Sequence, residues 1–344
     1  MSKRKKTQEN TIIHIAEALK LSPATISRAL NDHPYVKAQT KKDVLEMAAQ
    51  LGYRRNLMAS GLRNNKTKTV GLIVPRISMF FHAEVITTIQ NALHQQGYKL
   101  IICQSSDLLE LEKELTEILY ASRVEALIVA CTLQTIDFSH FDKVIDQGLP
   151  VIFYDRAPLN GHRATMVVGD DVHGGYLAGK HLIDRGCKRI AHLSGHLSSN
   201  LYRNRLSGFR QALMEAGMEL GDDQVLHREL SAEEAHKAME FFFSKEVVPD
   251  GVFLANDVSA IAALQFARER GIPVPEKLKI VGYSNDPRTS IISPPISTVE
   301  QFPQQVGLRV VTELMALLKA EGNIPETDTA PIVIPVELIS RASS

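Results

Sequence analysis

Apolar positions follow two different rhythms along the chain, and the change falls near residue 68. In the first part, the residues that recur on one helix face are Ile12, Ile15, Ala16 and Leu19. Ser22 and Pro23 then favour a new helix start, because the Ser oxygen can accept from free backbone N–H groups and Pro suits the first turn. We expect this second helix over residues 23–30, with its inner face formed by Ile26, Ala29 and Leu30.

A third helical pattern is expected to begin at Thr40, with Asp43 in the capping-box position three residues later. Its expected buried residues are Val44, Leu45, Ala48 and Leu51, and Gly52 should end it. Three short helices, of which the first two are joined by a very short turn, describe a helix-turn-helix module. An ordinary small helical bundle with a charged, solvated face is the alternative.

After Lys68, short apolar runs alternate with helical stretches. The candidate strands are 70–74, 100–103, 126–130, 151–154, 166–168, 190–193, 251–254, 280–283 and 332–336. The helices expected between them include 83–96, 109–122, 174–185, 205–216, 232–244 and 259–270. Such alternation predicts parallel sheets covered by helices on both faces. Because 276 residues follow Lys68, we expect two lobes rather than one.

Charge separates the same two parts of the chain. The whole has 39 basic and 39 acidic residues, but the first 68 residues contain 14 basic and 5 acidic ones, a net of +9, which leaves −9 for the rest. A basic head on an acidic body is expected where one end meets a polyanion, either nucleic acid or an anionic membrane. Arg28 and the small or hydroxyl side chains around it suit a DNA major groove, which favours nucleic acid.

Composition restricts the remaining classes. With 44% hydrophobic and 23% charged residues, the chain is typical of a folded globular protein. No apolar run approaches the ~18 to 20 residues of a membrane span, and no apolar signal core follows the basic start, so we expect a cytoplasmic protein. Its three cysteines, Cys103, Cys131 and Cys187, are widely spaced, which predicts reduced thiols.

The run that begins at Thr11 closely resembles the N-terminus of LacI/GalR-type transcription regulators: TIIHIAEALKLSPATISRALNDHPYVKAQTKKDVLEMAAQLGYRRNLMASGLRNNKTKTVGLIVP. Segments of the body resemble the same family at the expected places: VIFYDRAP, HLIDRGCKRIAHLSG, NRLSGF, GVFLANDVSA, LKIVGYSNDP and PPISTVEQ. The resemblance implies the α/β class, with an N-terminal all-α helix-turn-helix DNA-binding domain and a hinge helix. A bilobal parallel-sheet effector domain like that of periplasmic binding proteins would follow.

The resemblance also implies domain limits. We expect the helix-turn-helix domain at 1–53, the hinge helix and linker at 54–68, and the effector-binding and dimerisation domain at 69–344. The chain would cross between lobes three times, near Gly169, Ser297 and Thr327. The first lobe would then comprise about 69–169 and 298–327, and the second about 170–297 and 328–344.

In this family, side chains near the start of the second helix and an Arg four residues later face base edges. Pro23 and Ala24 can offer only apolar contact, so we expect Arg28 to supply most polar readout, at a guanine. Thr25 and Ser27 would contact phosphates and set register, or would be plain surface hydroxyls. The implied DNA-binding residues are Thr11, Pro23, Ala24, Thr25, Ser27, Arg28, Asn31, Asn56, Ala59 and Leu62.

Residues 54–64 match the family's hinge, which is too short to be a stable helix alone and should order when two copies pack on DNA. Leu62 matches the leucine that such proteins wedge into the minor groove; a buried linker contact is the alternative. The sequence departs from the family twice. Lys20 stands where a turn glycine is common, and Arg55 replaces the usual proline.

Ligands of open parallel sheets bind beyond the carboxyl ends of the strands, and a cleft between two lobes gathers such ends from both sides. The resemblance implies that Asp155, Arg205 and Asn256 hydrogen-bond an effector and that the stretch from Phe80 to His82 covers it. The implied effector-binding residues are Phe81, His82, Asp155, Arg205, Asn256, Ser284 and Asn285. Carboxylate, guanidinium and amide groups around an apolar wall suit a sugar or sugar derivative.

Several of these positions have alternative roles. Asp257 is as well placed to cap the following helix as to bind ligand, and Phe80 and Phe81 can be core or dimer contacts. Ser284 stands where many relatives have a ligand-binding aspartate, and Ala130 replaces a polar residue used by some. These departures leave the effector open, including a purine-like corepressor.

No catalytic motif is found, and we expect no enzyme activity, cofactor or metal. His192 and His196 are four residues apart but straddle a strand end. The sequence therefore predicts a homodimeric repressor of carbohydrate-utilisation genes that binds a pseudo-palindromic double-stranded DNA operator under effector control, without a membrane partner. The alternatives are a solute-binding protein without DNA function, an enzyme with a fused DNA module, and a corepressor-type regulator that responds to a non-sugar metabolite.

Overall fold

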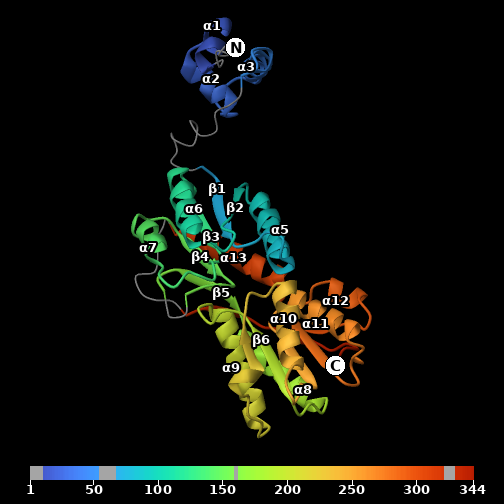
Figure 1. Ribbon diagram of the computed structural model, residues 1–344. Coiled ribbons are helices and arrows are strands. Elements are labelled where there is room, and N and C mark those ends of the chain that lie inside the picture. The colour runs from blue at the N-terminus through green and yellow to red at the C-terminus, as the bar shows by residue number, and fades with distance from the viewer. Residues whose placement is uncertain (1–10, 54–66, 159–161, 321–329) are drawn as a thin grey trace, which may run out of the picture. The chain divides into compact units, whose positions relative to one another are not determined.

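The computed structural model describes residues 11–53, 67–158, 162–320 and 330–344. The chain divides into two compact units, 1–67 and 68–344, which we call the head and the body (Figure 1). Each is described by itself. The predictions for Asn56, Ala59 and Leu62 lie outside the described residues.

The head consists of three helices around a small apolar core. Their bounds are Ile12–Leu19 for α1, Pro23–Leu30 for α2 and Ala38–Gln50 for α3. The buried core residues are Ile15, Ala16, Ile26, Ala29, Val44 and Ala48. The Ser22 hydroxyl accepts from the Thr25 N–H at 3.1 Å, and Pro23 occupies the first helical position. The predicted bounds of α2 are thus confirmed, and the physical basis is the cap.

The start and inner face of α3 differ from the prediction. The helix begins at Ala38 and not at Thr40, and its N-cap, Lys37, makes no side-chain capping bond. Asp43 instead accepts from the Gln39 side chain at 2.8 Å. Leu45, expected to be buried, is 56% exposed, because it lies roughly 100° around the helix from Val44.

The body contains two sheets, each with helices on both sides (Figure 1). In the first lobe the elements are β1 (Thr69–Val74), α5 (Phe80–Gln95), β2 (Lys99–Gln104), α6 (Leu109–Ala121), β3 (Ala126–Val129), α7 (Ser139–Asp146), β4 (Val151–Tyr154), β5 (Thr165–Gly169), α13 (Pro303–Lys319) and β11 (Ile332–Ile334). In the second lobe they are α8 (Asp171–Asp184), β6 (Ile190–Ser194), α9 (Asn200–Glu215), η1 (Asp222–Gln224), β7 (Val225–His227), α10 (Ala232–Phe243), β8 (Gly251–Leu254), α11 (Asp257–Glu269), β9 (Lys279–Tyr283), α12 (Arg288–Ile291), β10 (Ser297–Glu300) and β12 (Glu337–Ile339).

Among the described residues, each sheet has six strands. The orders are β11-β5-β4-β3-β1-β2 and β12-β10-β9-β8-β6-β7. Neighbouring strands pair in parallel, except for the antiparallel pair of β10 with β12. This arrangement is the one predicted by strand-helix alternation, because a parallel neighbour requires a crossover helix.

Strand pairing moves two of the expected crossings between lobes. β10 pairs with β9, so the second lobe continues to Glu300, past the expected crossing near Ser297. The run 332–336, expected as one strand of the second lobe, is divided. Its first part, β11, pairs with β5 of the first lobe, and β12 pairs with β10 of the second. The third crossing therefore lies between Ile334 and Glu337, where Pro335 cannot donate to a ladder.

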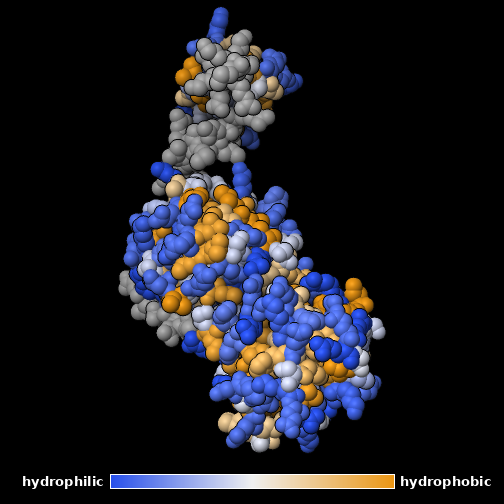
Figure 2. Space-filling view, in the orientation of Figure 1, coloured by the Kyte–Doolittle hydropathy of each residue, from blue (hydrophilic) through white to orange (hydrophobic). Residues whose placement is uncertain are grey.

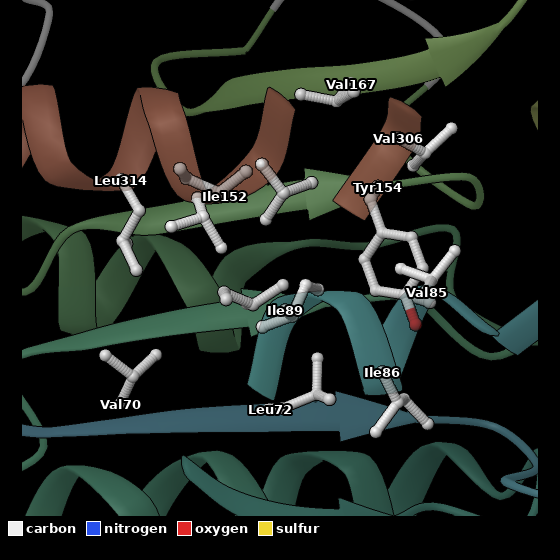
Figure 3. Packing of buried hydrophobic residues seen from close by; sticks show 14 of the residues in the cluster. Val70, Leu72, Val85, Ile86, Ile89, Ile152, Tyr154, Val167, Val306 and Leu314 are labelled. Carbon is white, nitrogen blue, oxygen red and sulfur yellow. The ribbon is translucent and has the colours of Figure 1, made fainter. Parts of the chain in front are cut away.

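Apolar side chains cover both faces of each sheet. Figure 3 shows one face of the first sheet, where Leu72 and Ile152 point toward Ile89 of α5 and Leu314 of α13. A second cluster covers the opposite face, and the second sheet has two corresponding clusters. None of the helices in the described ranges is long and apolar enough to span a membrane.

Candidate functional site

The outer face of α2 presents the side chains predicted to meet DNA. Pro23, Ala24, Arg28 and Asn31 are exposed, whereas Thr25 and Ser27 are half-buried. Thr25 Oγ1 hydrogen-bonds to the Ser22 hydroxyl at 2.9 Å, so it helps to cap the helix it belongs to. Asn31 Nδ2 donates to the Ser27 carbonyl at 2.7 Å at the other end. The face is therefore fixed at both ends.

The turn before α2 has the departure noted in the sequence. Lys20 ends α1 with φ +51° and ψ +39°, which is the left-handed region. The N–H of Leu21 donates to the Ala16 carbonyl at 3.0 Å across this turn. A residue with a Cβ occupies the region at some cost, so Lys20 is tolerated rather than favoured there. Thr11, which precedes α1, is exposed, and its N–H donates to His14 Nδ1 at 3.0 Å.

In the body, strand ends from both lobes meet in one region. Asp155 follows β4 of the first lobe directly, Ala255 follows β8 and Tyr283 ends β9 of the second. Asn200 joins the two lobes, because its Nδ2 donates to the Asp155 carbonyl at 2.9 Å and its Oδ1 accepts from the Ala157 N–H at 3.1 Å. The residues that follow these strands are thus brought together between the lobes, in the region where the sequence predicts the cleft.

Asp155 has the properties of a ligand-binding acceptor. Its side chain is 8% exposed, and burial, opposed by the nearby Arg205, raises its pKa to about 6. His82 Nε2 lies 3.9 Å from its Oδ2. Burial lowers the pKa of His82 to about 3, so the ring is neutral near pH 7 and this contact is not an ion pair. His82 Nδ1 shares a hydrogen bond of 3.2 Å with the Tyr154 hydroxyl, which fixes the ring.

Arg205 is buried and strongly bound within the second lobe. Its Nε donates to Asp171 Oδ1 at 2.8 Å, and its Nη1 donates to the Ala255 carbonyl at 2.8 Å. The guanidinium carbon lies 3.6 Å from the ring centroid of Tyr283, whose hydroxyl also donates to Asp171. Such a buried cation, bonded through Nε and Nη1, organises the groups around it as much as it offers a contact.

Two glycines allow this arrangement. A Cβ on Gly175 of α8 would lie 1.9 Å from the Arg205 carbonyl, and one on Gly208 of α9 would lie 1.7 Å from the Val172 carbonyl. The backbones of α8 and α9 can approach this closely only without those side chains. The approach brings Asp171 and Arg205 together.

Sequence reasoning overlooked Arg156, which follows Asp155 directly. Arg156 is 4% exposed, and its Nη1 donates to Asp107 Oδ1 at 2.5 Å. Its Nε and the buried hydroxyl of Ser199 make no hydrogen bond within the described part of the chain. The segment VIFYDRAP contains this arginine, but a charged residue after a strand end does not indicate which residue is its ion-pair partner.

The second-lobe amide and carboxylate have structural bonds. Asn256 caps α11, since its Oδ1 accepts from the Ser259 N–H at 2.8 Å, and its Nδ2 donates to the Leu230 carbonyl at 3.0 Å. The cap is therefore Asn256 and not Asp257. Asp257 accepts from Thr298 at 2.7 Å and from the Asp286 N–H, and burial raises its pKa to about 6.

Ser284 and Asn285 are bonded to the segment where the chain leaves the second lobe. Ser284 Oγ donates to the Gln301 side chain at 2.8 Å, and Asn285 Nδ2 donates to Glu300 Oε2 at 2.6 Å. Asn285 Oδ1 also accepts from Arg341 Nη2 at 2.6 Å. Within the described ranges, neither residue makes a hydrogen bond or ion pair with Asp155. Phe81, the remaining predicted contact, is 6% exposed and belongs to the core cluster beside the first sheet.

Histidines and cysteines do not form a metal site within the described residues. His192 is buried in the second lobe, where its Nδ1 bonds to the Phe253 carbonyl at 2.9 Å and its ring stacks on Phe253. His196, its neighbour in sequence, is exposed. Two side chains with such different surroundings do not converge on one ion.

A helix-turn-helix head joined to a bilobal body with buried polar groups at the strand ends between its lobes is typical of DNA-binding regulators that carry a small-molecule sensor. Residues 11–56 match the bacterial regulatory proteins of the lacI family, and residues 180–344 match the periplasmic binding protein-like domain. The chain belongs to the LacI family and is a DNA-binding transcriptional repressor, not an enzyme.

Curated relatives extend over nearly the whole chain. It is 33% identical to the HTH-type transcriptional repressor PurR of Pasteurella multocida (strain Pm70) over 335 residues, which are 97% of this chain and 98% of that protein. It is 31% identical to the repressor of the same name from Vibrio cholerae serotype O1 (strain M66-2), over 90% of this chain and 91% of that one.

Solved structures share the fold. The lac repressor bound to ONPG in its repressed state matches with a TM-score of 0.85 at 24% identity, over 98% of this chain and 100% of that one. A complex of the transcriptional regulator CelR with cellobiose matches with a TM-score of 0.73 at 25% identity, over 98% and 100% of the two chains. The α/β architecture of the body and the helical head are thereby confirmed.

Proposed function

We propose that this repressor binds a pseudo-palindromic operator as a homodimer and that a small molecule in the cleft between the lobes sets its affinity for DNA. The polar cleft carries this proposal: a buried carboxylate, Asp155, lies beside two buried arginines where strand ends of both lobes meet. An effector bound there would contact both lobes. It would therefore shift any equilibrium between lobe arrangements by its differential affinity for them.

DNA recognition is assigned to the outer face of α2. Arg28 is exposed on that face, with the apolar Pro23 and Ala24 one turn earlier. Arg28 reads a guanine, and the two apolar residues contact a thymine methyl. Thr25, Ser27 and Asn31 set the register on phosphates. Leu62, with Asn56 and Ala59, acts in the minor groove when two hinges pair.

Dimer formation is supported by the edge of the first sheet. β2 is an edge strand, and large apolar side chains on it and on α6 are exposed: Ile101 is 39%, Ile118 47% and Tyr120 40% exposed. Figure 2 shows hydrophobic side chains gathered on the visible face of the first lobe. A monomer gains nothing from such exposure, whereas a second copy would bury it. The solved lac repressor bound to its operator is described as a dimer.

The effector is proposed to be a sugar-like, hydroxyl-rich molecule. Asp155 offers acceptors, while Arg156 Nε and the Ser199 hydroxyl are polar groups without a hydrogen-bond partner in the described structure. Hydroxyl groups can donate to the carboxylate and accept from the guanidinium, so one molecule can satisfy both. Asp107, Asp155 and Asp171 stand against Arg156 and Arg205, which gives no surplus of positive charge for an anion.

A corepressor of non-sugar type, such as a purine-like molecule, is the second candidate. The curated relatives of about one-third identity carry the name PurR, whereas the cellobiose-bound regulator is 25% identical. Ser284 and Ala130 also depart from the polar residues that sugar-binding relatives use. With the first candidate, the repressor regulates carbohydrate-utilisation genes in the cytoplasm. With the second, it regulates other genes.

Genomic footprinting of the full-length protein tests both. Operators selected by the protein are titrated by fluorescence anisotropy with cellobiose, other neutral sugars, and the free purine bases. Release by a sugar supports the first candidate, and tighter binding with a purine base supports the second. If no sequence-specific operator is found, or if none of these molecules changes its affinity, the proposal fails.

A further inference from the structure

The turn after β2 places one carboxylate among three groups of the first lobe. Asp107 Oδ1 accepts from Arg156 Nη1 at 2.5 Å and from the Leu133 N–H at 3.4 Å. Asp107 Oδ2 accepts from Arg76 Nε at 3.4 Å. The Asp107 side chain is 17% exposed, so these bonds are partly shielded from water. None of the sequence patterns singled out this residue.

Two of these partners continue to the second lobe. Arg76 Nη2 donates to Glu229 Oε1 at 3.1 Å. The Leu133 carbonyl accepts from the Ser198 hydroxyl at 2.7 Å, and the Leu133 side chain packs on a cluster of the second lobe formed by Leu201, Tyr202 and Ala255. The first-lobe partner in each of these contacts is also bonded to Asp107.

The third partner lies beside Asp155. Arg156 follows Asp155 directly, and its buried Nε has no hydrogen-bond partner among the described residues. A guanidinium held by one carboxylate keeps a defined orientation, because a fork-shaped donor bonded at one end has few rotamers left. Asp107 thus holds the orientation of the Arg156 side chain beside Asp155.

The backbone at this turn is strained. Ser106 and Asp107 have φ values of +53° and +59°, so two consecutive residues with side chains occupy the left-handed region. Ser105 before them is buried, and its N–H donates to the Val74 carbonyl at 2.9 Å, which fixes the start of the turn. Such conformations persist only where the surrounding structure holds them, and they are common where geometry serves a function.

We propose that Asp107 is a positioning residue for lobe closure: its carboxylate holds the first-lobe side of two interlobe contacts and the Arg156 side chain of the cleft in one arrangement. The inference rests on the proposed function, because closure matters only if the cleft receives an effector. With these groups held in advance, bringing the lobes together costs less ordering of side chains. A larger fraction of the molecules is then in the closed arrangement, so an effector that binds this arrangement binds with higher apparent affinity.

Lobe closure can be measured without effector or DNA. Spin labels are attached to the full-length chain at Glu110→Cys on α6 and Glu233→Cys on α10, in a Cys103→Ser background; the two native side chains are 86% and 78% exposed. Labelled chain is diluted with unlabelled chain so that distances within one copy dominate. Double electron–electron resonance then gives the distribution of distances between the two spin labels, one on each lobe.

Asp107→Asn keeps the shape of the side chain but places an N–H donor against an arginine. We expect the ratio of closed to open molecules to fall roughly tenfold, the effect of weakening one set of charge-assisted hydrogen bonds. Asp146→Asn is the matched control, because Asp146 pairs with Arg163 at 2.6 Å within the first lobe. An unchanged distribution in Asp107→Asn, or an equal shift in Asp146→Asn, would overturn the proposal.

Exposed residues provide a second test, whose first step leaves Asp107 unchanged. The side chains of Arg76 and Glu229 are 48% and 58% exposed. Arg76→Gln and Glu229→Gln should each lower the closed fraction, because each removes one partner of the interlobe ion pair. In the Asp107→Asn background Glu229→Gln should lower it less, since Arg76 is no longer held in place. A Glu229→Gln effect of equal size in both backgrounds contradicts the role of Asp107.

These outcomes are separate from failure of the proposed function. If the wild-type chain selects no operator and responds to no tested molecule, the proposed function fails whatever the distances show. If the wild type responds normally while Asp107→Asn closes like the wild type, only the role of Asp107 fails.

Discussion

The head and the body place their recognition groups differently. On the head, Arg28 and its apolar neighbours stand on an exposed helix face, and the core beneath them is a separate set of side chains. In the body, Asp155, Arg156 and Arg205 are buried and take part in bonds that also hold the structure together. A helix that enters a DNA groove must project its side chains from an exposed, convex surface. A small effector instead needs an enclosed cleft.

This difference determines what a mutation reports. A change on the exposed face of α2 should alter recognition with little effect on stability. A change in the cleft removes both a candidate contact and a structural bond, so binding and stability should fall together. The following predictions test that contrast, from the largest expected effect to the smallest.

Arg205→Ala should have the largest effect, because it leaves Asp171 buried without its cation. We expect a loss of about 3 to 5 kcal/mol in the free energy of unfolding of the body, together with loss of the effector response. Denaturant unfolding monitored by circular dichroism, beside operator titration, measures both. Arg210→Ala, on the exposed side of the same helix, is the control. A stable variant with a normal response would show that the cleft has been assigned wrongly.

Arg28→Ala should change recognition alone. We expect discrimination at one base pair in each half-site to fall by ~1 to 3 kcal/mol, while the free energy of unfolding changes by less than about 0.5 kcal/mol. Binding to a set of single-base operator variants measures the first quantity. An equal loss of affinity on every sequence would instead indicate a phosphate contact. Lys42→Ala on the exposed face of α3 serves as a control for loss of charge.

In His192→Phe, the free energy of unfolding should fall less than in the wild type as the pH is lowered from 7 to 5. Burial lowers the pKa of folded His192 to about 3 from 6.5, so between these values the unfolded chain takes up the proton and the folded chain does not. The stability present above about pH 6.5 is therefore lost as the pH falls, on the order of 2 kcal/mol by pH 5.

The measurement compares unfolding free energies of the wild type and His192→Phe at pH 5 and pH 7. Asp155 and Asp257, whose pKa values are raised to about 6, act in the opposite direction, because they stabilise the folded chain as the pH falls through 6. Both are present in wild type and variant, so the difference isolates His192. His94→Phe, at an exposed position, controls for the loss of a histidine. Parallel profiles for wild type and His192→Phe would contradict the prediction.

Lys20→Gly should have the smallest effect and the opposite sign. Glycine adopts the left-handed conformation of this turn without a Cβ clash, so we expect the head to gain about 0.5 to 1 kcal/mol. Hydrogen exchange of the α1 and α2 amides in the full-length chain measures this gain. Protection that is lower in the variant would mean that the lysine side chain has a role the turn geometry does not show.

Local patterns in the sequence predicted the elements well where local physics decides them. Ser22 and Pro23 determined the start of α2, and strand-helix alternation indicated parallel sheets, as the structure confirms. Prediction was poorer where no local feature fixes the boundary of an element. The start of α3 is an example, because no side chain caps that helix. The run 332–336 lies where the chain passes from one sheet to the other, and its apolar pattern does not indicate which sheet it joins.

The candidate site follows the same division. Residues that come directly after strands, such as Asp155, could be named from the sequence, because parallel strands bring their carboxyl ends to one edge. Partners could not: Arg205 bonds to Asp171 across 34 residues, and Arg156 bonds to Asp107 across 49. By itself the sequence determined the class of fold, the basic head and the positions of polar residues at strand ends. Only the tertiary structure decided which charges meet, because a hydrogen bond depends on separation in space, and separation along the chain does not fix it.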